Sequence, residues 1–151
     1  MRLYLVQHGE AKSEAKDPER SLTNRGEEET RKVSIAAKGL SIRPLKIYQS
    51  GKKRAEQTAR IIAGAIGLSA QLGQGLNPND DVHPWVERIS SETEDLMIVG
   101  HLPFLEKLAS FLVCGREGEK AVMFRYSAIV CLEKKASGRW VVERVIKPET
   151  Q

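Results

Sequence analysis

Three apolar segments of the chain each end in polar residues that could bind and attack an anion. The residues at these ends are Gln7-His8-Gly9, Ser50-Gly51 and Gly100-His101, and Arg54 follows the second of them. A histidine can attack phosphorus and hold the phosphoryl group covalently. Arginine presents a fork of donors that matches a phosphate, and a second, protonated histidine adds a donor to the developing charge. Donors outnumber acceptors, so these residue types predict a phosphorylated ligand.

The elements around these residues predict how they meet. Strands are expected at 2–6, 45–49 and 95–99, and they alternate with helices that run from the N-cap Thr23 to about Leu40, from 54 to 66, and from Pro103 to about Cys114. This alternation is typical of an α/β sandwich with a mainly parallel sheet. The carboxyl ends of parallel strands share one edge, where helix N-termini that bind anions also begin. His8, Arg54 and His101 are therefore expected in one crevice.

The rest of the chain changes character. Residues 69–84 are expected to hold a short strand at best and a loop, and a short helix is expected around 85–89. Residues 127–133 and 139–146 are partly alternating and β-branched, which predicts a hairpin added to the sheet. No repeat or linker interrupts the sequence, so residues 1–151 are expected to form a single domain.

The composition of the chain argues against several kinds of partner and location. The net charge of +4 comes from 24 basic residues interleaved with 20 acidic ones, and only 5% of residues are aromatic. This pattern does not favour nucleic acid as a partner. No apolar run is long enough to span a bilayer, and the first residues lack the pattern of a signal peptide, so a cytoplasmic protein is expected. Cys114 and Cys131 have apolar neighbours and are expected to be buried free thiols.

Four segments resemble motifs of the histidine phosphatase superfamily, also called the phosphoglycerate mutase-like family, in the family's order. They are Leu5-Val6-Gln7-His8-Gly9-Glu10 (the "RHG" signature), Leu22-Thr23-Asn24-Arg25-Gly26 ("LTxxG"), Ser50 to Ala59 ("SxxxRAxQTA") and Val99 to Pro103 ("GHxP"). The short length, the absence of a large inserted lid and the segment 19–23 are most similar to SixA-type phosphohistidine phosphatases. The resemblance implies a three-layer, phosphoglycerate mutase-like sandwich.

The resemblance also implies roles. His8 would be the nucleophile that becomes transiently phosphorylated, and Arg54 and His101 would bind the phosphoryl group. The residues implied to line the phosphate and substrate site are Gln7, Gly9, Arg20, Ser50 and the backbone N–H of Leu102. No metal or organic cofactor is expected. The implied substrate is a phosphorylated protein of the histidine-containing phosphotransfer type, or a small phosphoester.

The first departure from the family pattern is Gln7, which stands where the family has arginine. Glutamine keeps a donor but loses the charge and the fork. The loss of a donor to the transition state costs on the order of a hundredfold in rate. Gln7 is therefore compatible with a slow enzyme, with a changed substrate, or with a protein that binds a phosphorylated ligand without turnover. Retained activity is favoured, because His8, Arg54 and His101 are all present.

The second departure is the carboxylic acid that larger family members use to protonate the leaving group. Asp80 and Asp81 are candidates, and Glu10 is a weaker one. A phosphohistidine substrate would ease this need, because an imidazole takes up a proton near neutral pH. A metallohydrolase that uses the two histidines with Asp80 or Glu10 is an alternative, although no HExxH-like ligand pair is present. His83, in a loop before Pro84, is expected to have a surface or packing role.

Overall fold

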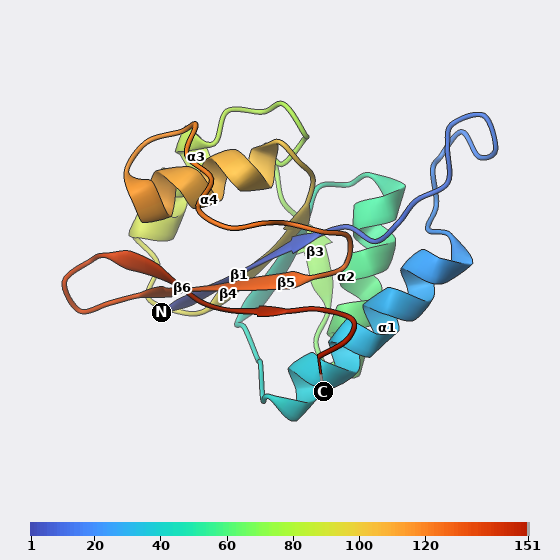
Figure 1. Cartoon of the computed structure of the whole chain (residues 1–151), viewed down its shortest axis with the longest axis horizontal. Helices are drawn as coiled ribbons and strands as arrows, with labels where there is room; N and C mark the ends of the chain where they lie inside the picture. Colours follow the sequence, from blue (N-terminus) through green and yellow to red (C-terminus); the bar gives the residue numbers. More distant parts are fainter. Residues whose placement is uncertain (151) are drawn as a thin grey trace.

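The computed structural model describes residues 1–150 and places six strands in one mixed sheet, in the order β3-β2-β4-β1-β5-β6 (Figure 1). The strands are β1 (Arg2–Gln7), β2 (Lys46–Gln49), β3 (Ala70–Leu72), β4 (Leu96–Gly100), β5 (Ile129–Lys134) and β6 (Trp140–Ile146). The helices are α1 (Asn24–Gly39), α2 (Lys53–Ala65), α3 (His83–Ser90) and α4 (Phe104–Cys114). The predicted order of strands and helices is confirmed.

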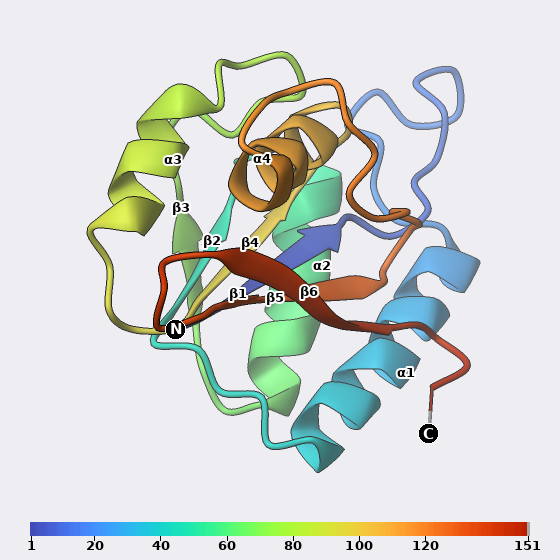
Figure 2. The same cartoon turned by 60° about the vertical axis from the view of Figure 1, so that its left-hand side comes forward.

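Helices cover both faces of the sheet and make it the middle of three layers. Residues of α1 and α2 pack on one face, with Tyr4 and Val6 of β1. Residues of α3 and α4 pack on the other face, with Leu3 and Leu5. Successive side chains of a strand point to opposite faces, so the run of apolar residues in β1 is explained by burial on both sides. Figure 2 shows the two pairs of helices on opposite sides of the strands.

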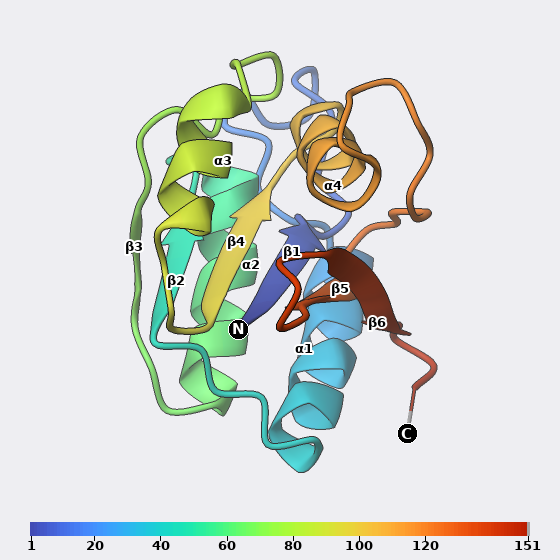
Figure 3. The ribbon, with the colours of Figure 1, turned by 90° about the vertical axis from the view of Figure 1, so that its left-hand side faces the viewer.

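The parallel register places the ends of the central strands level with one another. β1 pairs with β4 so that Gln7 lies opposite Gly100, and β2 pairs with β4 so that Gln49 lies opposite Val99. The residues that follow these strand ends, among them His8, Ser50 and His101, therefore emerge at the same edge of the sheet. Figure 3 shows the arrows of β1 and β4 pointing the same way towards this edge.

The expected C-terminal hairpin is present. β5 runs antiparallel to β1 and to β6, which forms the edge of the sheet. The strand begins at Ile129 and not at the predicted position 127, because Ser127 has a left-handed backbone with φ of 67°. The helix predicted around 85–89 begins earlier, at His83, so His83 belongs to a helix and not to the expected loop. Pro84 there suits a first helical turn.

The two cysteines differ from one another. Cys131 is buried as expected, and burial raises the pKa of its thiol to about 12, so it is unreactive near neutral pH. The prediction for Cys114 was wrong, because this residue is exposed at the last position of α4, where the helix ends on Gly115 with a left-handed backbone. Within residues 1–150, no helix has the length and apolar character needed to cross a membrane.

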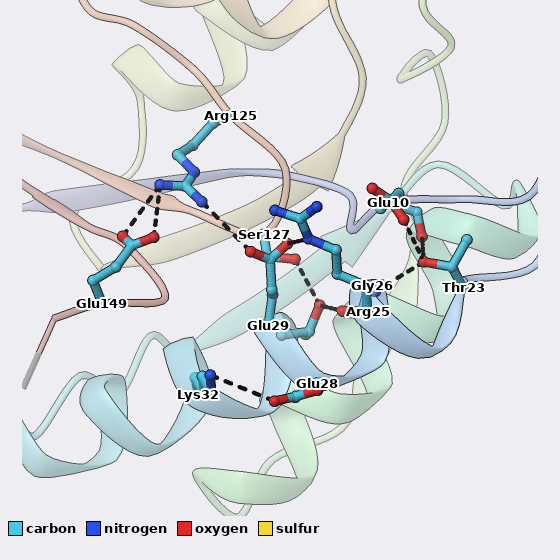
Figure 4. Close-up of polar contacts among 11 residues, drawn as sticks. Glu10, Thr23, Arg25, Gly26, Glu28, Glu29, Lys32, Arg125, Ser127 and Glu149 are labelled. Carbon is cyan, nitrogen blue, oxygen red and sulfur yellow. Dashed lines mark hydrogen bonds and ion pairs between the residues drawn. The ribbon is translucent and has the colours of Figure 1, made fainter.

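The start of α1 fastens the loop that follows β1. Thr23 caps the helix, its Oγ1 accepting from Gly26 N–H at 3.0 Å and donating to Glu10 Oε1 at 2.8 Å (Figure 4). The backbone of Gly26 lies so close to the loop that an added Cβ would sit 2.2 Å from Glu10 O. Only glycine allows this contact, which holds the loop next to the end of β1.

We predict that Gly26→Ala lowers the free energy of unfolding by about 1–3 kcal/mol, because its methyl group would push the loop away from α1. Gly64→Ala is the matched control, since Gly64 also lies in a helix but has no atom within 4 Å of an added Cβ. That change should raise stability by about 0.5–1 kcal/mol through helix propensity. Urea unfolding of both variants measures the difference. Equal effects would contradict a tight contact at Gly26.

Candidate active site

His8 continues β1 past its last residue, because its N–H donates to Gly100 O at 3.0 Å. The side chain is only 7% exposed, and its Nδ1 lies 2.7 Å from the carbonyl oxygen of Gly9. A carbonyl oxygen only accepts hydrogen bonds, so Nδ1 must carry the proton. The lone pair of the neutral ring is then on Nε2, which is the atom available as a nucleophile.

His101 lies directly beside His8, with the ring centroids 5.1 Å apart. Its Nε2 is 2.6 Å from Ser50 Oγ, which joins the ends of β4 and β2. Its Nδ1 is buried and has no hydrogen-bond partner among the residues described. Ser50, expected to bind phosphate, thus contacts His101 in this structure and orients the ring.

Arg54 is the second residue of α2, the helix that begins shortly after Ser50. Its Nε is buried and finds no hydrogen-bond partner within residues 1–150. The positive charge of Arg54 lowers the pKa of both His8 and His101, so the guanidinium lies close to both rings. The structure therefore brings the three residues together, as the strand and helix order predicted.

The charged groups that act on these two histidines are all positive. Burial, together with the charges of Arg54 and Arg20, lowers the pKa of His8 to about 4. Burial lowers the pKa of His101 to about 3, helped by His8, Arg54 and Lys52. No carboxylate is among the groups that shift either histidine. Two neutral rings near neutral pH, surrounded by cations, form a site suited to an anion.

Arg20 contributes to this positive charge from the loop between β1 and α1. Its backbone is left-handed, with φ of 52°, and its Nε donates to Lys12 O at 3.0 Å. The same loop is fastened by Asp17, which accepts from Ser21 N–H at 3.0 Å, and by Gln57 of α2, whose Oε1 accepts from Leu22 N–H at 2.7 Å. Arg20 is thus held near the histidines by a fixed loop.

Gly9 is enclosed on all sides. Its N–H donates to Thr58 Oγ1 of α2 at 2.9 Å, and Thr58 Oγ1 in turn donates to Arg54 O at 2.8 Å. An added Cβ at Gly9 would lie 2.9 Å from Thr30 Oγ1 and 3.0 Å from Ser127 Oγ. The close packing requires a glycine. Gly9 was expected to line the phosphate site, and its N–H holds the peptide that orients His8.

The three carboxylates predicted as candidate acids each have a structural partner. Glu10 accepts from Thr23, and Asp80 Oδ2 accepts from Asn77 N–H at 2.8 Å within a turn. Asp81 Oδ1 accepts from His83 N–H at 3.0 Å and lies 2.6 Å from His83 Nδ1, at the start of α3. The acid role of Glu10, Asp80 and Asp81 stays a prediction.

The described part of the chain contains no group of three His, Cys, Asp or Glu side chains placed to hold a metal ion. His101 contacts Ser50 and His8 contacts the Gly9 carbonyl, and no carboxylate is among the groups that shift the pKa of either ring. The metallohydrolase alternative would need a third ligand at this place.

Sequence reasoning missed three residues of the site. Thr58 lies one helical turn after Arg54. It belongs to the motif from Ser50 to Ala59, but the sequence predicted no role for it. Ser127 is fully buried, with its N–H donating to Gln7 O at 2.9 Å. Tyr126, next to it, places its ring centroid 5.6 Å from that of His8. Tyr126 and Ser127 lie far from the four motifs, at the start of the segment predicted as a hairpin strand, and nothing in that strand pattern indicated a place in the site.

The chain belongs to the histidine phosphatase superfamily (branch 1), whose sequence pattern matches residues 3–80, more than half of its 151 residues. An uncharacterized protein of Picosynechococcus is 35% identical over 126 residues, which cover 78% of this chain and 76% of that protein. The phosphohistidine phosphatase SixA of Escherichia coli is 29% identical over 145 residues, or 91% of this chain and 88% of SixA.

A solved structure of the protein histidine phosphatase SixA, complexed with tungstate, has the same architecture. It superimposes with a TM-score of 0.83 over 98% of this chain and 97% of SixA, at 26% identity. The expected phosphoglycerate mutase-like sandwich and the resemblance to SixA are both confirmed.

We predict that the stability of the protein falls as the pH is lowered from about 6.5 towards 4. The unfolded chain protonates His8 near its ordinary pKa of 6.5, whereas the folded chain keeps it neutral until about pH 4. The unfolded state therefore binds more protons in this window, which costs up to about 1.4 kcal/mol per pH unit for one such group. His8→Asn should flatten the dependence measured by urea unfolding at several pH values, in part only, because His101 behaves in the same way.

The control variant is His83→Asn. His83 is exposed and Asp81 raises its pKa, so its protonation favours the folded state as the pH falls. That gain falls above about pH 6.5, between the ordinary and the raised pKa, and is complete below it. Removing His83 should therefore leave the slope between pH 6.5 and 4 unchanged, in contrast to His8→Asn. Parallel curves for wild type and His8→Asn would show that His8 is not held neutral by the fold.

Proposed function

We propose that the protein is a metal-independent phosphatase that transfers a phosphoryl group to His8 and then to water. The observation that carries this proposal is the unprotonated Nε2 of His8, fixed by the bond from Nδ1–H to Gly9 O, next to the donors Arg54 Nε and His101 Nδ1, which have no partner within residues 1–150. A nucleophile beside unpaired buried donors and surrounded by cations is the arrangement that phosphoryl transfer requires.

The reaction has two steps. In the first, the lone pair of His8 Nε2 attacks phosphorus and the bond from phosphorus to the leaving group breaks, so that the leaving group departs with the electron pair and takes up a proton. In the second, water attacks phosphorus, the bond to Nε2 breaks, and phosphate and a proton are released. Arg54, His101 and the amide of Gln7 stabilise the equatorial oxygens, with the Leu102 N–H as a further donor.

We propose phosphohistidine on a protein as the substrate, of the histidine-containing phosphotransfer type, with small phosphoesters as a secondary class. The relative SixA is named a phosphohistidine phosphatase, and a SixA structure holds tungstate, a tetrahedral oxyanion like phosphate. No carboxylate shifts the pKa of His8 or His101, so the site offers no evident acid for an alkoxide leaving group. An imidazole leaving group is basic enough to leave with a proton from solvent. Arg20 would contact the substrate at the entrance, in a cytoplasmic single-domain enzyme.

The first prediction is that wild type forms an acid-labile phosphoenzyme and that His8→Ala does not. The variant should lose at least about a thousandfold in kcat/KM, because the covalent route is removed. Rapid acid quench after mixing with a phosphohistidine protein labelled with ³²P measures the intermediate, with and without a chelator. Chelator-sensitive turnover without a labelled enzyme would contradict the proposal, and a phosphoenzyme in His8→Ala would move the nucleophile elsewhere.

The second prediction concerns Gln7, whose Oε1 is buried with no partner within residues 1–150. Gln7→Arg should raise kcat by about ten- to a hundredfold, because a charged fork replaces a neutral amide in the transition state. Gln7→Met is the control, since it keeps the length without any donor and should not raise the rate. If wild type binds phosphohistidine protein without turnover and Gln7→Arg turns over, the protein is a phosphate-binding member of the family. An unchanged rate in Gln7→Arg would mean that Gln7 suits the native substrate.

A further inference from the structure

Tyr126 places a partly exposed aromatic ring beside His8. Its ring centroid lies 5.6 Å from that of His8, with an angle of 39° between the ring planes, and the residue is 42% exposed. Every other Phe, Tyr and Trp of the chain is buried or half-buried, and all of them lie within residues 1–150. The one exposed aromatic ring in this protein is therefore beside the nucleophile, where burial in the core cannot explain it.

The backbone on the C-terminal side of Tyr126 is firmly held. Ser127 N–H donates to Gln7 O at 2.9 Å, and Ser127 Oγ lies 2.8 Å from Thr30 Oγ1 of α1. Ser127 adopts a left-handed backbone, with φ of 67°, although it is fully buried. A non-glycine residue keeps this conformation only where the surroundings require it. The turn at Ser127 holds the preceding residue, Tyr126, with its ring next to that of His8.

The N-terminal side of Tyr126 is held by charge pairs. Arg125 contacts Glu149 at 3.1 Å and Glu29 of α1 at 3.5 Å, and Figure 4 shows its guanidinium between these two carboxylates. Each pair is partly exposed and worth little alone, but together they join the C-terminal segment, α1 and the segment before β5. Tyr126 thus stands between two anchored neighbours, which limits the ordering that its ring would need on binding.

We propose, on the basis of the function proposed above, that the face of Tyr126 forms the subsite for the leaving group and selects a flat imidazole over an aliphatic alcohol. Aromatic rings stack on planar partners at centroid distances of about 4.5–7 Å. Protonation of the free ring nitrogen of phosphohistidine prepares the imidazole to leave as a neutral molecule. Until the phosphorus–nitrogen bond breaks, the protonated ring carries a positive charge, and a cation is attracted to the face of a tyrosine ring. A serine leaving group has neither the plane nor the charge.

The experiment compares two peptides of one sequence that carry either phosphohistidine or phosphoserine. Tyr126→Ala should lower kcat/KM for the phosphohistidine peptide about three- to tenfold more than for the phosphoserine peptide. Tyr126→Phe should keep the wild-type ratio, because the ring face remains. Met123→Ala is the matched control from the same segment, since Met123 is 73% exposed, and it should leave both substrates unchanged. Tungstate binding, measured by calorimetry, should be equal in all variants.

Three results would overturn the proposal. Equal losses on both peptides in Tyr126→Ala would give the residue a structural role only. A loss in Tyr126→Phe as large as in Tyr126→Ala would assign the effect to the hydroxyl group and not to the ring face. If wild type hydrolyses no phosphohistidine peptide, the proposed function fails and this subsite fails with it. If wild type hydrolyses the peptide but Tyr126→Ala leaves the ratio of kcat/KM for the two peptides unchanged, the subsite alone is refuted.

Discussion

The parallel pairing of β1 with β4 is the constraint on which the rest of the site depends. Gln7 lies opposite Gly100, and the hydrogen bond from His8 N–H to Gly100 O continues the pairing past the end of β1. The residues that follow are the two histidines, and their rings come within 5.1 Å of one another. A shift of one residue in this register would turn one ring towards the opposite face of the sheet. The buried strands that flank the site make such a shift costly, because it would also reverse which side chains reach each core.

The same strand pairing buries the two histidines among positively charged side chains. Burial keeps both histidines neutral near neutral pH, while Arg20, Lys52 and Arg54 surround them with positive charge. A tetrahedral oxyanion would offset this repulsion and accept from Arg54 Nε and His101 Nδ1. The proposed binding of a phosphoryl group and the cost of gathering these cations thus have one origin. The neutral state of His8 is what leaves Nε2 free to attack, so desolvation contributes directly to the chemistry.

Helix α2 explains why one motif carries so many residues. Arg54, Gln57 and Thr58 lie three and four positions apart, so they share one face of the helix. The charge of Arg54 acts on His8 and His101, Gln57 holds the loop that carries Arg20, and Thr58 holds the Gly9 peptide. One rigid helix thus aligns the charge, the entrance loop and the peptide that orients the nucleophile.

The sequence by itself determined the order of elements and the edge of the sheet where His8, Arg54 and His101 meet, because apolar period, glycine position and motif spacing are local signals. It did not reveal that Gly9 N–H is used by Thr58, that Ser50 contacts His101, or that Cys114 is exposed. Nor did it indicate Tyr126 and Ser127, more than a hundred positions from His8 along the chain. These features depend on which segments pack together, and long-range packing leaves no periodic trace in the residues it brings into contact. Only the tertiary structure, by closing the segment before β5 onto the end of β1, decided what surrounds the nucleophile.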